Sequence, residues 1–208
     1  MKVHQIFGLL DDEMPVLFVS CSKKVKEWCF KNFYDYVLWN KSMCDSFVSE
    51  NYPEYEELYN NVRYKIMKVD IVRFLILHKY GGIYIDMDCI PKLISVKEND
   101  FKIAYKIAPK RKHYEMEIIQ SYKENNLLLE FLDYVKTQIE EKNKIEIYKT
   151  WKARYVYHTT GPYSLNRFLK NKDVNKFIIN EPNEKNLNLN GNEDFVSFPS
   201  CSYMNSFV

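Results

Sequence analysis

The stretch from residue 61 to residue 88 restricts the fold of this chain more than any other. It begins with NVRYKIMKVDIVRFLILHKY, in which apolar residues recur at the three- and four-residue spacing of a helix. Gly81 and Gly82 come next, and glycine is the usual residue just past a helix C-terminus. The segment 83–87 then opens with Ile-Tyr-Ile, an apolar run typical of a buried strand. We therefore expect a helix that ends at Gly81 and a strand that follows it at once.

Other segments carry weaker patterns of the same two kinds. Strands are predicted at 2–7, 15–21, 34–40 and 100–108, and helices at 22–33, 125–141 and from 162 onward. Ser22 is a natural N-cap residue, and Pro162 suits the first turn of a helix. The Asn-rich stretch 180–195 is predicted to be a mobile loop. The opening order of strand, helix and strand favours an α/β fold built in layers.

Asp86 and Asp88 stand at the end of the predicted strand, one residue apart. Alternate side chains of a strand point the same way, so both carboxylates would share a face if the strand continued. Neighbouring carboxylates repel, and burial worsens the repulsion unless a cation lies between them or one binds a proton. A hard divalent ion such as Mg²⁺ or Mn²⁺ prefers oxygen ligands and also binds phosphate oxygens. The pair therefore predicts a metal site, and the alternative is a solvent-exposed turn, where Asp is common.

Composition narrows the classes of function. The chain has 208 residues, of which 46% are hydrophobic, enough for one domain with a substantial core. Its net charge of +2 gives no electrostatic case for a nucleic-acid partner. The chain has only five glycines and neither G-x-G-x-x-G nor G-x-x-x-x-G-K-[ST], which argues against a Rossmann dinucleotide site and a P-loop.

The cysteines and the first residues bear on the compartment. The five cysteines are odd in number and form no C-x-x-C, a pattern typical of a reduced intracellular protein. The N-terminal stretch does not match a signal peptide, and no apolar run reaches the length of a membrane span. These features predict a cytoplasmic protein, or a domain cut from a larger one.

Residues 70–88, DIVRFLILHKYGGIYIDMD, resemble the D-x-x-R…L-x-x-x-G-G-x-Y-x-D-x-D signature of the DXD sugar-binding glycosyltransferases. KVHQIF resembles the opening strand of this family, and HTTGPYSL resembles its later T-G-P turn. The family includes the yeast initiating α-1,6-mannosyltransferase, capsular polysaccharide transferases and the glucosylating clostridial toxins. The chain is also similar to the N-terminal transferase domain of a multidomain chlorella-virus protein, which allows a virus-encoded enzyme.

The resemblance implies a fold. It is the GT-A nucleotide-sugar-binding fold of the α/β class, a mixed and mostly parallel central sheet flanked by helices. Residues 1–208 would then form a single glycosyltransferase domain, or the N-terminal part of a longer protein.

The resemblance also implies roles for individual residues. Asp86 and Asp88 would be the metal ligands, Asp88 directly to Mn²⁺ or Mg²⁺ and Asp86 in part through water. The catalytic residues would be Asp86, Asp88 and Arg73. The donor-binding residues would be His4, Gln5, Ile6, Phe7, Asp70, Arg73, Gly82, Tyr84 and Asp86. Structural interpretations stand beside these roles: Asp70 and Arg73 also suit a surface ion pair, and Tyr84 also suits an ordinary core position.

The chain departs from the family in one respect. Many members carry a later histidine or acidic residue, often near Ser-Trp, that completes the metal site. The C-terminal stretch FPSCSYMNSFV holds no such residue. Either that ligand lies beyond residue 208, or His158, Asn190, Asp194 or water takes its place.

The predicted function is transfer of a hexose from a nucleotide diphosphate sugar, UDP favoured over GDP, to a hydroxyl of a glycan or glycoprotein. Inverting chemistry would need a carboxylate base, for which Glu115, Glu117 and Asp133 are equal candidates, whereas retaining chemistry needs none. Two other classes compete with this prediction. A haloacid dehalogenase-type phosphohydrolase also ends a strand in D-x-D, but Gly-Thr usually follows there, and Cys89-Ile90 follows here. A nucleotide-sugar-binding module without catalysis is the other.

Overall fold

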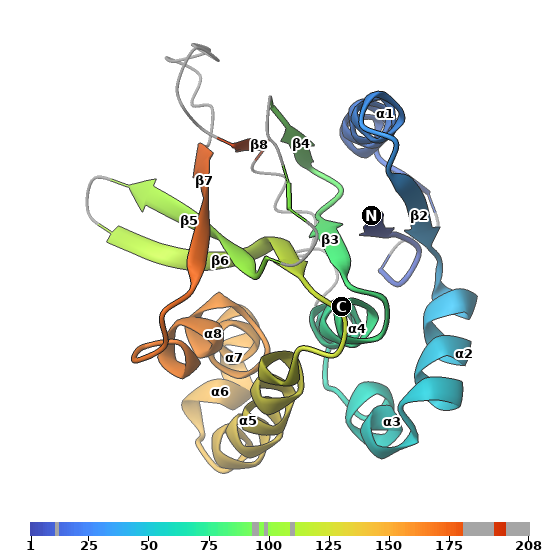
Figure 1. Cartoon of the computed structure of the whole chain (residues 1–208). Helices are drawn as coiled ribbons and strands as arrows, with labels where there is room; N and C mark the ends of the chain where they lie inside the picture. Colours follow the sequence, from blue (N-terminus) through green and yellow to red (C-terminus); the bar gives the residue numbers. More distant parts are fainter. Residues whose placement is uncertain (11–12, 93–95, 98–99, 109–110, 181–193, 199–208) are drawn as a thin grey trace.

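One mixed sheet organises the molecule. Our computed structural model of the chain describes residues 1–10, 13–92, 96–97, 100–108, 111–180 and 194–198 (Figure 1). Within these residues the sheet has eight strands in the order β2-β1-β3-β6-β5-β7-β8-β4. The strands are β1 Lys2–Ile6, β2 Asp35–Trp39, β3 Gly82–Ile85, β4 Cys89–Pro91, β5 Lys102–Ala108, β6 Arg111–Ser121, β7 Asn175–Asn180 and β8 Phe195–Ser197.

The strand directions are mixed, as predicted. Four neighbouring pairs are parallel, namely β1 with β2, β1 with β3, β5 with β7, and β7 with β8. Three pairs are antiparallel, namely β3 with β6, β5 with β6, and β4 with β8. The mixed sheet in which parallel pairs are the majority is therefore confirmed.

Helices flank this sheet on both faces. They are α1 Val16–Lys31, α2 Lys41–Asn51, α3 Pro53–Asn60, α4 Lys65–Tyr80, α5 Asn126–Asn143, α6 Ile147–Thr150, α7 Lys152–Thr159 and α8 Pro162–Phe168. Strand β3 shows how the two faces differ, because its side chains alternate. Ile83 and Ile85 pack in a cluster with α1, whereas Tyr84 packs in the larger cluster with α4 and α5.

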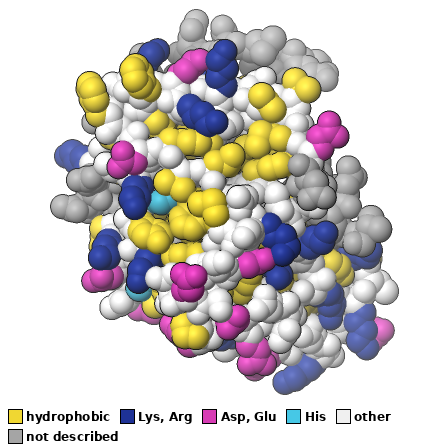
Figure 2. All heavy atoms as spheres, turned by 90° about the vertical axis from the view of Figure 1, so that its right-hand side faces the viewer, with side chains coloured by type: hydrophobic (Ala, Val, Ile, Leu, Met, Phe, Trp, Pro, Cys, Tyr) yellow, Lys and Arg dark blue, Asp and Glu magenta, His cyan; other side chains and the backbone are white. Residues whose placement is uncertain are grey.

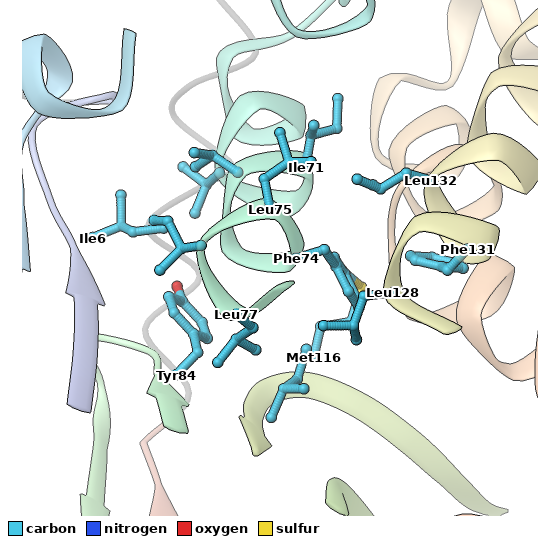
Figure 3. Close-up of a cluster of buried hydrophobic side chains, with 14 of the residues drawn as sticks. Ile6, Ile71, Phe74, Leu75, Leu77, Tyr84, Met116, Leu128, Phe131 and Leu132 are labelled. Atoms are coloured by element: carbon cyan, nitrogen blue, oxygen red, sulfur yellow. The ribbon is translucent and has the colours of Figure 1, made fainter. Parts of the chain in front are cut away.

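Helix α4 is the centre of the larger cluster. Residues 69–77 are all buried, so the helix is covered on every side rather than on one stripe. Figure 3 shows α4 side chains between the sheet and α5, with Phe74 facing Phe131. The ring centroids of these two residues are 4.8 Å apart. The predicted apolar stripe of α5 is confirmed, since Leu128, Phe131 and Leu132 are buried.

The outer side of α1 is less well covered. Figure 2 looks onto the side of the molecule that carries α1 and β2, where hydrophobic side chains gather among charged ones. Val16, Phe30 and Phe33, in α1 and just after it, are each more than 80% exposed. These side chains therefore contribute nothing to either face of the core.

The structure corrects two predicted elements. Residues 15–21 are not a strand: Pro15 is the N-cap of α1, and Ser22 lies buried within that helix rather than at its start. The β-branched residues of this run favour a strand only weakly. The segment is helical because a helix lets Val25 and Trp28 pack on the sheet. The strand predicted at 83–87 ends at Ile85, and residues 86–88 form a turn.

Several elements carry no pattern that the sequence reasoning detected. These are α2, α3, α6, α7, β4, β6, β7 and β8. Of the loop predicted at 180–195, residues 181–193 lie outside the described residues, and Phe195 begins β8. Within the part of the chain that the structure describes, no helix has the length and apolar character needed to cross a membrane.

Candidate functional site

The junction between α4 and β3 brings a helix and a strand together within two residues. Gly81 and Gly82 both have positive φ angles, +63° and +95°, which glycine adopts without strain. A Cβ atom on Gly82 would overlap the carbonyl oxygen of Lys2 in β1. Gly82 is therefore required both for its backbone conformation and for the close approach of β3 to β1.

The two carboxylates lie in the turn that follows β3. The amide of Cys89 donates to the Asp86 carbonyl at 3.1 Å, which closes the turn. The Asp86 amide donates to the Glu117 carbonyl in β6 at 2.7 Å, and the Phe198 amide donates to the Asp88 carbonyl at 3.0 Å. The turn is thus held from both sides at the carboxyl end of a central strand, where ligands bind in open α/β sheets.

A cavity of about 380 Å³ opens at this turn. Seven of the residues predicted to bind the donor or the metal line it: Ile6, Phe7, Asp70, Arg73, Tyr84, Asp86 and Asp88. The other polar or charged residues of the wall include Lys106, Glu115, Glu117 and Tyr157. Side chains from three parts of the chain, residues 6–88, 106–162 and 197–198, thus line one cavity.

Arg73 connects the carboxylates of the cavity. Its guanidinium donates to Asp70 Oδ1 at 2.9 Å and to Asp86 Oδ1 at 3.3 Å. It also donates to the carbonyls of Val69 and Met116 at 3.2 and 2.8 Å. Arg73 and Asp70 are buried, with 3% and 7% exposure, so they are not the surface ion pair that the sequence also allowed.

Tyr84 completes this network. Its hydroxyl donates to Asp86 Oδ1 at 2.5 Å, and its ring lies 4.7 Å from the Arg73 guanidinium carbon. Figure 3 shows the ring leaving β3 on the side of α4. Within the described residues, both hydrogen bonds that the Asp86 carboxylate accepts go to Oδ1, so Oδ2 is the oxygen available to a ligand.

Burial dominates the electrostatics of Asp86. It raises the pKa of this carboxyl to about 7, although Arg73 opposes the rise, and the Asp88 charge adds to it. Burial also raises the pKa of Glu117, against the opposing effect of Lys106. A cation close to the two aspartates would lower the pKa of Asp86, because it would favour the ionised form.

The cavity wall is rich in negative charge. Its charged residues are Asp70, Asp86, Asp88, Glu115, Glu117, Arg73 and Lys106, a net charge of −3 when all are ionised. Arg73 is bonded to Asp70 and Asp86, and Lys106 is bonded to Glu117 at 2.8 Å. Both cations of the described wall are therefore already offset by carboxylates.

Three of the predicted donor-binding residues lie behind the cavity wall rather than in it: His4, Gln5 and Gly82. His4 bonds the Gly81 carbonyl at 3.0 Å and accepts from the Trp39 indole at 3.2 Å. Gln5 donates to the Asp86 carbonyl at 3.2 Å. In this structure His4 and Gln5 thus support the junction and the turn from behind.

Two of the three additional side chains considered for the metal site lie outside the cavity wall. The His158 ring stacks on Tyr163 and contacts the Tyr148 hydroxyl, and it does not line the cavity. Asp194 accepts from the Ile178 amide at 2.9 Å and is also absent from the wall. Asn190 lies outside the described residues.

The carboxylate pair has the right chemistry for a hard divalent ion, since both side chains present oxygen atoms to the same cavity. In the described ranges, however, no group of three or more His, Cys, Asp or Glu side chains is placed to hold a metal ion. The pair therefore fits an ion that is also bound by water or by a phosphate group, as Mg²⁺ commonly is.

The structure places two of the three candidate bases in the cavity wall. Glu115 and Glu117 line the cavity, whereas Asp133 accepts from the Tyr55 hydroxyl and is not part of the wall. The sequence reasoning missed Lys106, and it assigned no role to Thr160, whose hydroxyl bonds Asp70. The T-G-P turn was the available signal for Thr160. The alternation of His113, Glu115 and Glu117 along β6 was the available signal for that strand.

Comparison with known proteins agrees with this geometry. Residues 15–100 match the family described as glycosyltransferase sugar-binding region containing DXD motif. Inositol phosphoceramide mannosyltransferase 3 of Schizosaccharomyces pombe is 44% identical over 86 residues, which are 41% of this chain and 23% of that protein. An uncharacterized glycosyltransferase of Acanthamoeba polyphaga mimivirus is 34% identical over 91 residues, 42% of this chain and 35% of that protein.

A solved structure supports the fold independently. The PaToxG glycosyltransferase superimposes with a TM-score of 0.55 at 17% identity, covering 81% of this chain and 68% of that one. At this identity the likeness shows the fold alone, and that fold is the predicted GT-A type. The chain spans about a quarter of the length of the S. pombe relative, 23%.

Proposed function

We propose that this chain, whose residues 15–100 match the glycosyltransferase sugar-binding region with a DXD motif, binds a nucleotide diphosphate sugar with a divalent metal and transfers its hexose. The observation that carries the proposal is the position of Asp86 and Asp88. They lie after a central strand and line a cavity whose two described cations are both paired with carboxylates. A diphosphate would be repelled there unless it came with a metal ion.

The proposed roles follow the positions of the side chains. Asp88 binds Mn²⁺ or Mg²⁺ directly, and Asp86 uses Oδ2 for the metal or for the donor. An ion held there would supply positive charge to offset the charge that develops on the diphosphate as the sugar leaves. Arg73 and Tyr84 hold Asp86, and Asp70 holds Arg73. These three residues face the donor, while Ile6 and Phe7 form an apolar wall.

UDP is the favoured nucleotide and GDP the second. The named relative is a mannosyltransferase acting on inositol phosphoceramide, so mannose and a lipid-linked hydroxyl join the donors and acceptors to be tested. The favoured acceptor is a hydroxyl of a glycan or glycoprotein.

The first experiment measures thermal unfolding with UDP and with GDP, each with and without Mn²⁺. We expect stabilisation only with nucleotide and metal together, by roughly 2.7 kcal/mol at a hundred times the dissociation constant. Asp88→Asn should abolish this stabilisation. Asp133→Asn should retain it, because Asp133 lies outside the cavity wall.

Other outcomes would favour other functions. A wild-type protein that neither nucleotide stabilises in the presence of metal would contradict the proposal. Hydrolysis of a generic phosphate ester, lost in Asp86→Asn, would support a phosphohydrolase instead. Binding of a UDP-sugar that is never hydrolysed or transferred would support the binding module.

A further inference from the structure

The corner between α7 and α8 lies against the cavity. Its residues Gly161 and Pro162 line the wall, while the preceding Thr160 is buried, with 1% exposure, and is not a wall residue. A Cβ atom on Gly161 would lie 2.9 Å from the Cα of Tyr157, so only glycine lets the corner close this tightly. The corner is therefore a packed feature with one side chain directed into the protein.

That side chain bonds a residue of the cavity. The Thr160 hydroxyl donates to Asp70 Oδ2 at 2.7 Å, and Asp70 Oδ1 accepts from Arg73 at 2.9 Å. Arg73 in turn donates to Asp86 Oδ1. Four side chains from α4, the α7–α8 corner and the turn after β3 thus form one continuous chain of hydrogen bonds that ends at the carboxylate pair.

We propose that Thr160 is a positioning residue: its hydroxyl fixes the Asp70 carboxylate, and through Arg73 it sets the orientation of Asp86. The inference rests on the proposed function for its effect on catalysis. Asp70 is buried, so each of its oxygens needs a donor. If the donor to Oδ2 is lost, the carboxylate turns to share the Arg73 guanidinium through both oxygens. The N–H groups that Arg73 gives to Asp86 then shift.

Three substitutions separate this role from simple packing. Thr160→Val keeps the shape of the side chain and removes the donor, whereas Thr160→Ser keeps the donor. Thr159→Val is the matched control: Thr159 is also fully buried, but its hydroxyl donates to the Tyr155 carbonyl within α7. Thr159→Val should therefore destabilise the same corner without touching Asp70.

The first readout is steady-state kinetics with the nucleotide sugar as the varied substrate, measured by transfer or by hydrolysis of its sugar. Loss of a residue that orients a metal site commonly costs about 10–100-fold. We expect a fall of that size in kcat/KM for Thr160→Val, and values within about threefold of wild type for Thr160→Ser and Thr159→Val. Equal losses in Thr160→Val and Thr159→Val, or no loss in Thr160→Val, would overturn the inference.

The second readout needs no activity. The side-chain Nε–H of Arg73 is buried and hydrogen-bonded to Val69, so it should give a distinct NMR signal, assigned by its loss in Arg73→Lys. Thr160→Val should move this signal, and Thr159→Val should leave it in place. An unmoved signal in Thr160→Val would overturn the inference. If Thr160→Val moves the Arg73 signal but the wild-type protein neither binds nor turns over a nucleotide sugar, the result would instead contradict the proposed function.

Discussion

At the scale of single residues, His4 shows how one buried side chain holds the base of the site. The Trp39 indole can only donate, so Nδ1 of His4 accepts and Nε2 carries the proton that it donates to the Gly81 carbonyl. The ring is therefore neutral in the folded protein. Burial lowers the pKa of His4 from 6.5 to about 4.

This pKa predicts how stability depends on pH. Between pH 6.5 and about 4 the unfolded chain binds a proton at His4 that the folded chain does not. The free energy of unfolding should therefore fall as pH falls through this window, by roughly 3 kcal/mol from His4, and the effect should level off below it. Urea denaturation of wild type and His4→Gln at several pH values measures the difference.

The variant provides its own control. His4→Gln should be the less stable protein at pH 7.5, because two buried hydrogen bonds are altered, and the gap to wild type should narrow toward pH 4.5. A gap that stays constant over this range would contradict the assignment of a neutral, buried His4.

At the scale of elements, the sequence predicts the helices and strands whose own residue pattern determines their conformation. Helix α4 has an apolar run and Gly81 at its end, and β3 follows it directly, so both were predicted. The pattern failed at 15–21, where β-branched residues favour a strand but packing on the sheet makes the first turns of α1. Strand β6 was missed although its polar residues alternate with Tyr114, Met116 and Ile118, because its first residues are all charged or polar and mask this period-two pattern.

The junction of α4 and β3 allows a matched test. Gly82 and Gly8 both have strongly positive φ angles, +95° and +91°. A Cβ on Gly82 would overlap the Lys2 carbonyl, whereas the nearest atom to a Cβ on Gly8 would be 3.8 Å away. Gly8→Ala should cost about 1–2 kcal/mol from backbone strain alone. Gly82→Ala should cost about 1–3 kcal/mol more, because the strands must also separate.

Urea denaturation of the two alanine variants gives this comparison directly. Equal losses of stability in both would mean that backbone conformation alone requires glycine at Gly82. The close approach of β3 to β1 would then contribute nothing.

At the scale of the whole molecule, the site combines near and distant residues. Asp86 and Asp88 were predicted from the sequence because they stand one residue apart and a clear pattern precedes them. Lys106 and Thr160 were not assigned, and Glu117 was only one of three equal candidates for a base, since only the folded sheet and the α7–α8 corner bring these residues to the same cavity network. No local pattern encodes a hydrogen bond between residues 70 and 160.

The layers around α4 predict where stability resides. Phe131 is 1% exposed and packs its ring on Phe74, which joins α5 to the central helix. Phe131→Ala should lower the free energy of unfolding by about 3–5 kcal/mol, because it removes a large buried ring and leaves a cavity. Phe33→Ala is the control, since Phe33 is 94% exposed and its loss should change stability by about 0.5 kcal/mol or less.

A large effect of Phe33→Ala in that experiment would mean that the exposed aromatic side chain packs on something in solution. A small effect of Phe131→Ala would mean that α5 can shift to refill the space beside α4.

The pairing of β3 with β1 has a consequence for how the protein forms. Residues 2–6 are synthesised well before one of their two neighbours in the sheet, the strand at residues 82–85, and β6 must then pair with the other side of that strand. Pairings between such distant segments are slow steps in folding. The turn that carries both aspartates should therefore acquire its shape late in folding, so that the proposed binding of a nucleotide with metal would report a fully assembled sheet. A folding assay that measures this proposed binding would therefore detect only chains in which β1 has paired with β3.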